Sequence, residues 1–299
     1  MIHKRNWLGT IVAAAAAVLL LGACATTGAR DAADDDDDRD RTRRVPHALA
    51  ALESIAQANP RPWHTARARN FKIAYHAHRE LAERVVRRAA ALWQTTHARW
   101  QGRAAAASDL SCEVTLYNSY RELVVMTGGS PKLGEAHVRH SRLMRGRILT
   151  CRINLTADDH HLLDATLPHE ITHIVLGQLV GRRVPLWANE GAATRAERAA
   201  RRHAHRRALV RRALASGRAY ALADLFRIHI YPASAWQRRV FYAQSFTVVD
   251  LLLRLGGHAR FLRLLRAAHD SGWSRALSSV YGLTSLQQLE QALRADLAR

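Results

Sequence analysis

The sequence lacks several features that would assign it to a specialised class of protein. Its 299 residues include only three cysteines, which excludes a miniprotein stapled by disulfides. No run of about 20 apolar residues occurs, so no ordinary transmembrane helix is expected. The apolar fraction of 48% is too high for a disordered protein and sufficient for a hydrophobic core.

Lysine is almost absent, although the chain is strongly basic. Lys4, Lys72 and Lys132 are its only lysines among 45 basic residues, and the formal net charge is +20. A bias of this kind toward arginine indicates coding composition rather than selection for a charged surface. The charge alone therefore does not predict nucleic-acid binding, no motif for such binding occurs, and no nucleic-acid partner is expected.

The N-terminus has the pattern of a bacterial export signal. A basic start at 3–5 is followed by an apolar stretch at 8–21, which suits a signal peptide. It ends in Leu21-Gly22-Ala23-Cys24, which resembles the lipobox of bacterial lipoproteins. The resemblance implies a signal peptide at 1–23, lipid on Cys24 and stable membrane anchoring through several acyl chains. Ala25, which follows the cysteine, favours sorting of the lipoprotein to the outer membrane, where it would face the periplasm. The alternative is an ordinary secretory signal with an incidental cysteine.

Residues 24–46 are expected to form a solvated tether. They contain seven Asp and five Arg and few apolar side chains, so they cannot bury enough surface to fold. We place the folded domain at 47–299.

Hydrophobic periodicity predicts an α+β fold, with a small N-terminal sheet and helices followed by a mostly helical half. A long loop is expected to begin at 127, and nearly everything from 162 onward is expected to be helical. One of these helices is expected at 188–215, with an arginine-rich solvated face. The strands are expected at 71–75, 112–117 and 149–155, and the earlier helices at 47–58, 77–101 and 118–126.

Cys112 and Cys151 lie on the apolar faces of two predicted strands. Because Cys24 would carry lipid, these two form an even pair in an oxidising compartment. A disulfide between neighbouring strands and two buried free thiols are both consistent with this pattern.

Residues 169–173 have the sequence His-Glu-Ile-Thr-His, which predicts a metal site on a helix. His169 and His173 are four residues apart, so both imidazoles lie on one face and can bind one metal ion. Glu170 is about 100° round the helix, where it can act on a water but not readily bind the metal.

The flanking residues favour a helix at this motif. Asp164 or Thr166 can cap its N-terminus, and Pro168 is tolerated in the first turn. Gly181 can end it. Random placement of the histidines and glutamates of this chain would give only about 0.03 copies of the motif.

A third ligand follows at a suitable distance. Sixteen residues separate His173 from Glu190, enough to finish one helix, turn at 181–185 and begin an antiparallel one. The first turn of that helix would return Glu190 to the two histidines. Two histidines and one glutamate leave a fourth position open, which is the pattern of a catalytic zinc site. The alternative is a carboxylate that stabilises a helix N-terminus.

The runs at 166–173 and 185–191 resemble the peptidase-MA-like branch of the gluzincins, the zinc peptidases related to thermolysin. The strands at 71–75 and 112–117 also occupy expected places, so the resemblance covers about residues 65–299. It implies a thermolysin-like core with one Zn²⁺ per chain. It further implies that His169, His173 and Glu190 bind the zinc and that Glu170 is the general base.

Two further residues bear on this chemistry. Gluzincins often supply an oxyanion donor from a downstream helix, and Tyr242 is the candidate here, with Tyr231 and His229 as alternatives. Tyr242 could equally be a core aromatic. Many gluzincins carry an Asp four residues after the ligand Glu, bonded to a zinc histidine, whereas this chain has Thr194. Such a loss typically costs about 10–100-fold in metal affinity or activity.

These features predict an outer-membrane lipoprotein with a zinc-dependent peptidase domain, acting on peptides or proteins of the envelope. The first alternative, motivated by Thr194, is an envelope-binding or chaperone-like lipoprotein that retains the fold with little catalysis. The second alternative is an amidase acting on peptidoglycan stem peptides with the same metal chemistry.

Overall fold

A computed structural model describes residues 62–103, 110–127, 139–144, 147–181 and 183–299. The signal peptide, Cys24, the tether and the helix expected at 47–58 lie outside these residues. The chain divides into two compact units, one of 1–61 with 121–133 and one of 62–120 with 134–299. In the first, the structure describes α3 (Tyr120–Thr127), the helix expected at 118–126. All other elements below belong to the second unit.

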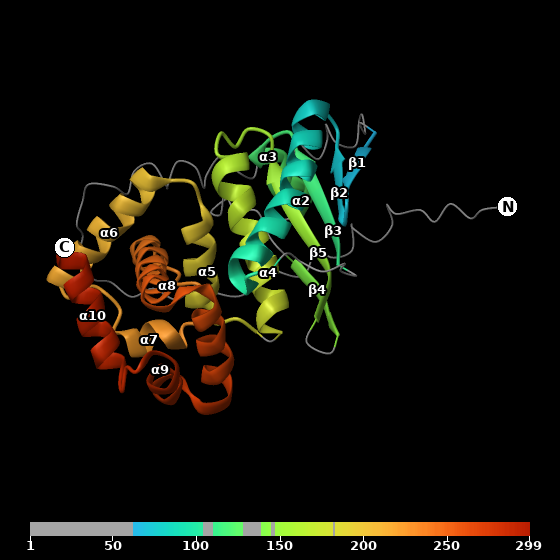
Figure 1. The fold of residues 1–299 in the computed structure, drawn as a ribbon. Helices are drawn as coiled ribbons and strands as arrows, with labels where there is room; N and C mark the ends of the chain where they lie inside the picture. The colour runs from blue at the N-terminus through green and yellow to red at the C-terminus, as the bar shows by residue number, and fades with distance from the viewer. Residues whose placement is uncertain (1–61, 104–109, 128–138, 145–146, 182) are drawn as a thin grey trace, which may run out of the picture. The chain divides into compact units, whose positions relative to one another are not determined.

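This unit is α+β, a small mixed sheet followed by a mostly helical half, as the sequence predicts (Figure 1). The sheet has the order β1-β2-β3-β5-β4. Its three central strands β2, β3 and β5 are parallel, while the edge strands β1 and β4 are antiparallel to their neighbours. The strands are β1 (His64–Ala68), β2 (Phe71–Tyr75), β3 (Ser111–Tyr117), β4 (Arg139–Met144) and β5 (Arg147–Thr156).

The three central strands are the three that alternation predicts. In β2, for example, Phe71, Ile73 and Tyr75 are buried while the residues between them are partly exposed. The two edge strands were not predicted. β1 has the sequence His-Thr-Ala-Arg-Ala and is mostly exposed, so it shows no apolar alternation. β4 falls in the region expected to be loop, and its sequence Arg-His-Ser-Arg-Leu-Met is equally uninformative.

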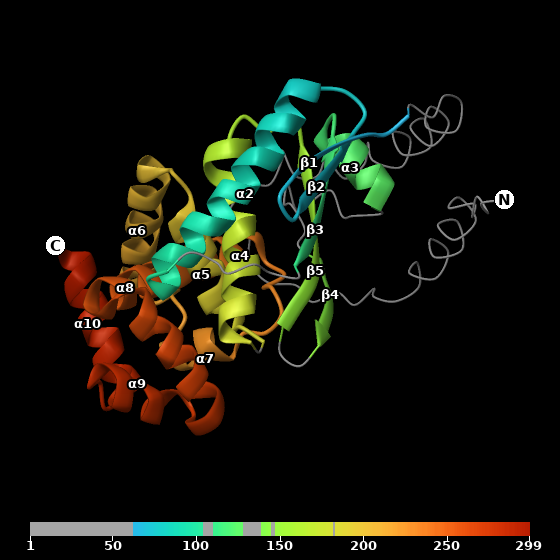
Figure 2. The ribbon, with the colours of Figure 1, turned by 45° about the vertical axis from the view of Figure 1, so that its right-hand side comes forward.

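Two helices, α2 (Arg79–Gln101) and α4 (Leu167–Val180), lie side by side along one face of the sheet (Figures 1 and 2). They are joined by a buried polar contact as well as by apolar packing. On α4, the side-chain oxygen of Gln178 accepts from the indole of Trp93 and bonds to the ring of His97, each at 3.0 Å. This contact fixes α4, and hence its histidine motif, against the sheet layer.

The helical half follows α4 on the side away from the sheet (Figure 2). Its central helix α8 is buried over most of its first half and changes direction at Gly257, whose φ is 68°. None of the helices in the described segments is both long and apolar enough to cross a membrane. The helices are α5 (Leu186–Ala196), α6 (Ala200–Ala215), α7 (Leu222–Arg227), α8 (Ala235–Ser271), α9 (Trp273–Tyr281) and α10 (Leu286–Ala298).

The single helix expected at 188–215 is wrong, because the chain breaks between α5 and α6. At the break the N–H of Arg198 donates to the carbonyl of Asp164 at 2.8 Å instead of continuing α5. No glycine or proline lies at the break itself, at 197–199, so a tertiary hydrogen bond ends α5 where the sequence gives no stop signal. The arginine face of α6 is also only partly solvated, since Arg206 and Arg207 bind buried acids.

Candidate metal centre

Helix α4 carries both histidines and Glu170. It continues from a wide π-helical turn (η3, Leu162–Thr166), so Thr166 already has helical backbone angles. The expected side-chain cap is therefore absent, and the Thr166 hydroxyl donates to Asp159 instead. Glycine ends the helix as expected, with Gly181 in the left-handed conformation. The ligand face of this helix is buried, Glu170 being 4% and His173 8% exposed.

Helix α5 brings Glu190 to this face, at its fifth residue rather than in its first turn. Two contacts fix the helix. The Trp187 ring is fully buried and stacks on Phe226 of α7 at 4.1 Å between ring centroids. Gly191 lies directly against α8, since a Cβ there would come within 2.4 Å of the Ser245 carbonyl oxygen. A larger residue would push α5, and Glu190 with it, away from α8.

The three predicted ligands converge. One atom from each of His169, His173 and Glu190 forms a group whose members all lie within 4.8 Å of one another. Nε2 of His169 is 3.5 Å from Glu190 Oε2, and Nε2 of His173 is 3.7 Å from Glu190 Oε1. Among the residues described, this is the group of acids, histidines and cysteines that can hold a metal ion.

These separations suit metal ligands better than direct hydrogen bonds. Both exceed the usual 2.7–3.2 Å of an N–H···O bond. Tetrahedral ligands placed at zinc–nitrogen and zinc–oxygen distances of about 2.0–2.1 Å would be about 3.3 Å apart. The donor set of two imidazoles and one carboxylate matches that of catalytic zinc sites. The residues present therefore fit a zinc ion.

Glu197 supplies a contact that the sequence analysis missed. Its Oε1 bonds to Nδ1 of His169 at 3.1 Å, leaving Nε2 of that ring toward Glu190. Thr194, expected to take this position, has a buried hydroxyl with no hydrogen-bond partner. The contact with His169 expected of Thr194 is therefore made by Glu197 instead. A signal was available, because glutamate is scarce here and Glu197 lies seven residues after Glu190.

Tyr231 is the aromatic residue that reaches the ligands. Its hydroxyl donates to Glu190 Oε1 at 2.6 Å. Tyr242, the first candidate from sequence, stacks on the Tyr231 ring at 6.0 Å between centroids. His229, the other alternative, is exposed and bonds to the carbonyl of Arg227. Tyr231 therefore has its hydroxyl at the site, with Tyr242 as its neighbour.

The charges of the site compensate one another. Burial acts to lower the pKa of the His169 imidazole, but contacts with Glu190, Glu197 and Glu170 outweigh burial and raise it. Burial acts to raise the pKa of the Glu190 carboxyl, but the two histidines and Tyr231 outweigh burial and lower it. The site without metal therefore favours a proton on His169 facing ionised carboxylates. A cation that binds Nε2 must displace that proton.

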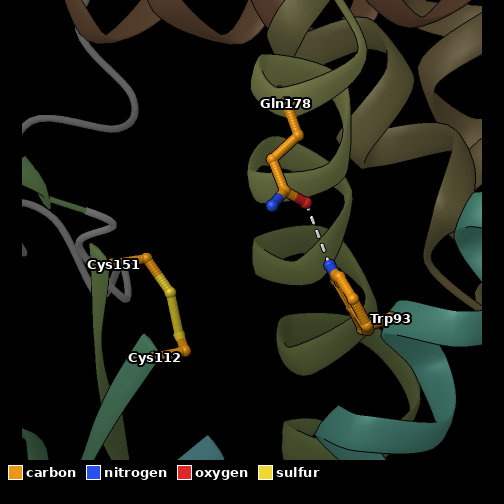
Figure 3. Close-up of a disulfide and its surroundings, with 4 residues drawn as sticks. All are labelled: Trp93, Cys112, Cys151 and Gln178. Atoms are coloured by element: carbon orange, nitrogen blue, oxygen red, sulfur yellow. Dashed lines mark hydrogen bonds between the residues drawn. A yellow bond between two sulfur atoms is a disulfide. The ribbon is translucent and has the colours of Figure 1, made fainter. Parts of the chain in front are cut away.

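The two remaining cysteines form a disulfide between β3 and β5 (Figure 3). Cys112 and Cys151 are register partners on these parallel strands, and both are buried. The bond confirms the first of the two alternatives from sequence. It joins two strands of the sheet, whereas the Trp93–Gln178 contact joins the two helices that cover one face of the sheet (Figure 3).

A scan of the sequence against protein-family models finds no match, and a search of curated proteins finds no similar sequence.

Proposed function

We propose that this protein is a zinc-dependent peptidase of the gluzincin kind, with a thermolysin-like core. The observation that carries the proposal is the convergence of His169, His173 and Glu190 from two helices, with a second buried acid, Glu170, next to His169 in the chain. The motif resemblance at 166–173 and 185–191 gives independent support. From the N-terminal lipobox pattern we further propose that lipid on Cys24 anchors the enzyme at the outer membrane, facing the periplasm, with envelope peptides or proteins as substrates.

Glu170 has the position of the general base in this reaction. Zinc, when bound by the three ligands, would lower the pKa of a water molecule and polarise a peptide carbonyl. Glu170 is adjacent to His169 in the chain and does not belong to the ligand group. It would accept the proton of the attacking water and pass it to the leaving amine.

Tyr231 is the donor best placed to stabilise the developing oxyanion. Its hydroxyl has one proton, which it donates to Glu190 Oε1, so it would turn from that carboxylate to the oxyanion when Glu190 binds the zinc. The residue is 41% exposed, so an incoming substrate can reach it. Its neighbour Ile230 is 73% exposed and offers an apolar contact at the same place.

The binding-protein alternative loses the observation that motivated it. It rested on the uncharged Thr194, but Glu197 provides a carboxylate to His169. The amidase alternative uses the same metal centre, so the choice of substrate in the assay decides it.

The replacement Glu170→Gln tests the proposal. It removes the base and leaves the three ligands in place, so we expect wild-type zinc content and a loss of hydrolysis of at least about 100-fold. Cleavage should be measured on denatured envelope protein and on peptidoglycan stem peptides, with Glu80→Gln, an exposed residue of α2, as the matched control. A Glu170→Gln variant as active as wild type would contradict the mechanism.

A further inference from the structure

Glu197 uses its two carboxylate oxygens for two different partners. Oε1 bonds to Nδ1 of His169, and Oε2 accepts from the guanidinium of Arg206, each at 3.1 Å. The side chain of Glu197 is 8% exposed and that of Arg206 is 22% exposed. A carboxylate fixed at both oxygens has one orientation, and it holds the plane of the imidazole that it contacts.

The contact also fixes which nitrogen of His169 is available. A neutral imidazole carries one proton. With Nδ1–H donated to Glu197, the lone pair is on Nε2, the atom that is 3.5 Å from Glu190 Oε2. Glu197 therefore selects the tautomer that can bind a metal at the converging group.

The break between α5 and α6 makes this arrangement possible. Glu197 is the residue at which α5 ends, with an extended backbone (φ −62°, ψ 133°). The next residue bonds to the carbonyl of Asp164, just before α4. The chain is thereby tied to the start of the histidine helix, and α6 then begins at Ala200 and carries Arg206 back to Glu197.

Arg206 also contributes to the charge balance of the site. Glu170, Glu190 and Glu197 are three buried carboxylates around one small site. A divalent cation and one guanidinium together neutralise them. Without Arg206 the loaded site would keep an uncompensated buried negative charge, which is costly at low dielectric.

We propose that Glu197 is the positioning residue for His169, in place of Thr194, and that Arg206 holds Glu197 in this role. The inference rests on the metal centre of the proposed function, but it does not depend on peptidase activity. It predicts that metal affinity is controlled from α6, outside both helices that carry the ligands.

The test is the Kd for Zn²⁺ of the detergent-solubilised full chain, measured by competition with a chromophoric chelator. We expect Glu197→Ala to weaken binding about 10–100-fold, and Arg206→Met to weaken it by a smaller factor that Arg206→Lys partly restores. The visible absorption of the Co²⁺-loaded protein should change in Glu197→Ala, because the imidazole is no longer held in one orientation.

Three variants separate positioning from folding. Arg207→Met is the matched control, since this neighbouring arginine of α6 binds the buried Asp296 instead, at 2.9 Å. It should lower stability and leave the Kd unchanged. Thr194→Val should also leave the Kd unchanged. Glu197→Gln retains an acceptor for His169, so it should bind zinc more tightly than Glu197→Ala. If the alanine variant fails to fold, the Kd of Glu197→Gln compared with wild type tests the role of the carboxylate.

A Glu197→Ala variant with the wild-type Kd would overturn this inference while the proposed function stands. The same holds if Thr194→Val weakens binding as much as Glu197→Ala. A wild type that binds neither Zn²⁺ nor Co²⁺ would overturn both together.

Discussion

Two neighbouring arginines of α6 each hold a buried carboxylate, and the two pairs differ in what else the acid contacts. Arg206 binds Glu197, whose second oxygen contacts the metal-ligand candidate His169. Arg207 binds Asp296 of α10, which is 2% exposed and also accepts from the guanidinium of Arg254. One acid thus joins an arginine to an imidazole, and the other joins only arginines.

From this difference we expect the Arg206–Glu197 pair to affect metal binding and the Arg207–Asp296 pair to affect stability. Oδ2 of Asp296 binds Arg207 of α6 and Arg254 of α8, so it ties α10 to both helices, while Oδ1 binds Arg299. Hydrogen bonds with Arg254, then with Arg207, keep its pKa far below the usual range for aspartate. Glu197 uses one oxygen for Arg206 and the other for His169, whose opposite ring nitrogen faces the candidate metal site. Variants of each acid should therefore affect different properties.

The largest expected effect on stability is that of Asp296→Ala. Removing one partner from a buried ion pair costs about 3–5 kcal/mol. The partly exposed arginines recover some hydration, so we expect a loss of about 3 kcal/mol in the free energy of unfolding, measured by urea denaturation. Zinc affinity should not change. Glu290→Ala, on the same helix with a solvent-facing partner, should cost less than about 1 kcal/mol. Equal losses in the two variants would contradict the contrast.

Gly191→Ala is expected to have the next largest effect, and to act on both properties. The new Cβ would meet the backbone of α8 at Ser245, which cannot move as a flexible side chain can. Overpacking of this kind costs about 1–3 kcal/mol. Because Glu190 is the preceding residue, zinc affinity should fall as well.

Gly256→Ala is the control for this variant. There a Cβ would meet side chains rather than backbone, namely Cδ of Arg260 and a ring carbon of Tyr281 on α9, and neither belongs to the metal-ligand group. This variant should keep its zinc affinity. If Gly191→Ala also keeps the wild-type zinc affinity, then the close packing of α5 on α8 does not determine the position of Glu190.

The smallest expected effect concerns His258, which faces cations rather than a carboxylate. Burial, together with the charges of Arg99 and Arg195, lowers its pKa from 6.5 to about 4. The unfolded chain therefore binds more protons between these two values, and stability falls as the pH drops from about 6.5 toward 4. His258→Phe keeps the ring contact with Trp100 and should flatten this part of the stability profile. An unchanged pH slope, with the exposed His205→Phe as control, would contradict this origin.

Much of the metal centre could be predicted from sequence because its signals are local. His169 and His173 share one helix face by spacing alone, and Glu190 follows from the length of chain between two helices. The two cysteines could be placed on the buried faces of their strands because both strands have apolar alternation, but the sequence left a disulfide and two free thiols open. The central strands of the sheet were predicted for the same reason.

The residues that the sequence did not reveal depend on tertiary contacts. Glu197 reaches His169 only because α5 ends where Arg198 bonds to Asp164, and no local signal marks that break. Tyr231 was named from sequence only as an alternative, because it precedes α8 in a segment without regular structure, whereas Tyr242 lies in a predicted helix. The edge strands β1 and β4 have too few apolar residues to show a period of two.

The measurement that tests the central claim most directly is the zinc content of the purified protein by elemental analysis. Wild type should be compared with His169→Ala and Glu190→Ala after metal is removed and added back. We predict one zinc per chain in wild type, and a loss or strong weakening in both variants with the fold retained by circular dichroism. A well-folded wild type that takes up no zinc would contradict the proposed metal centre.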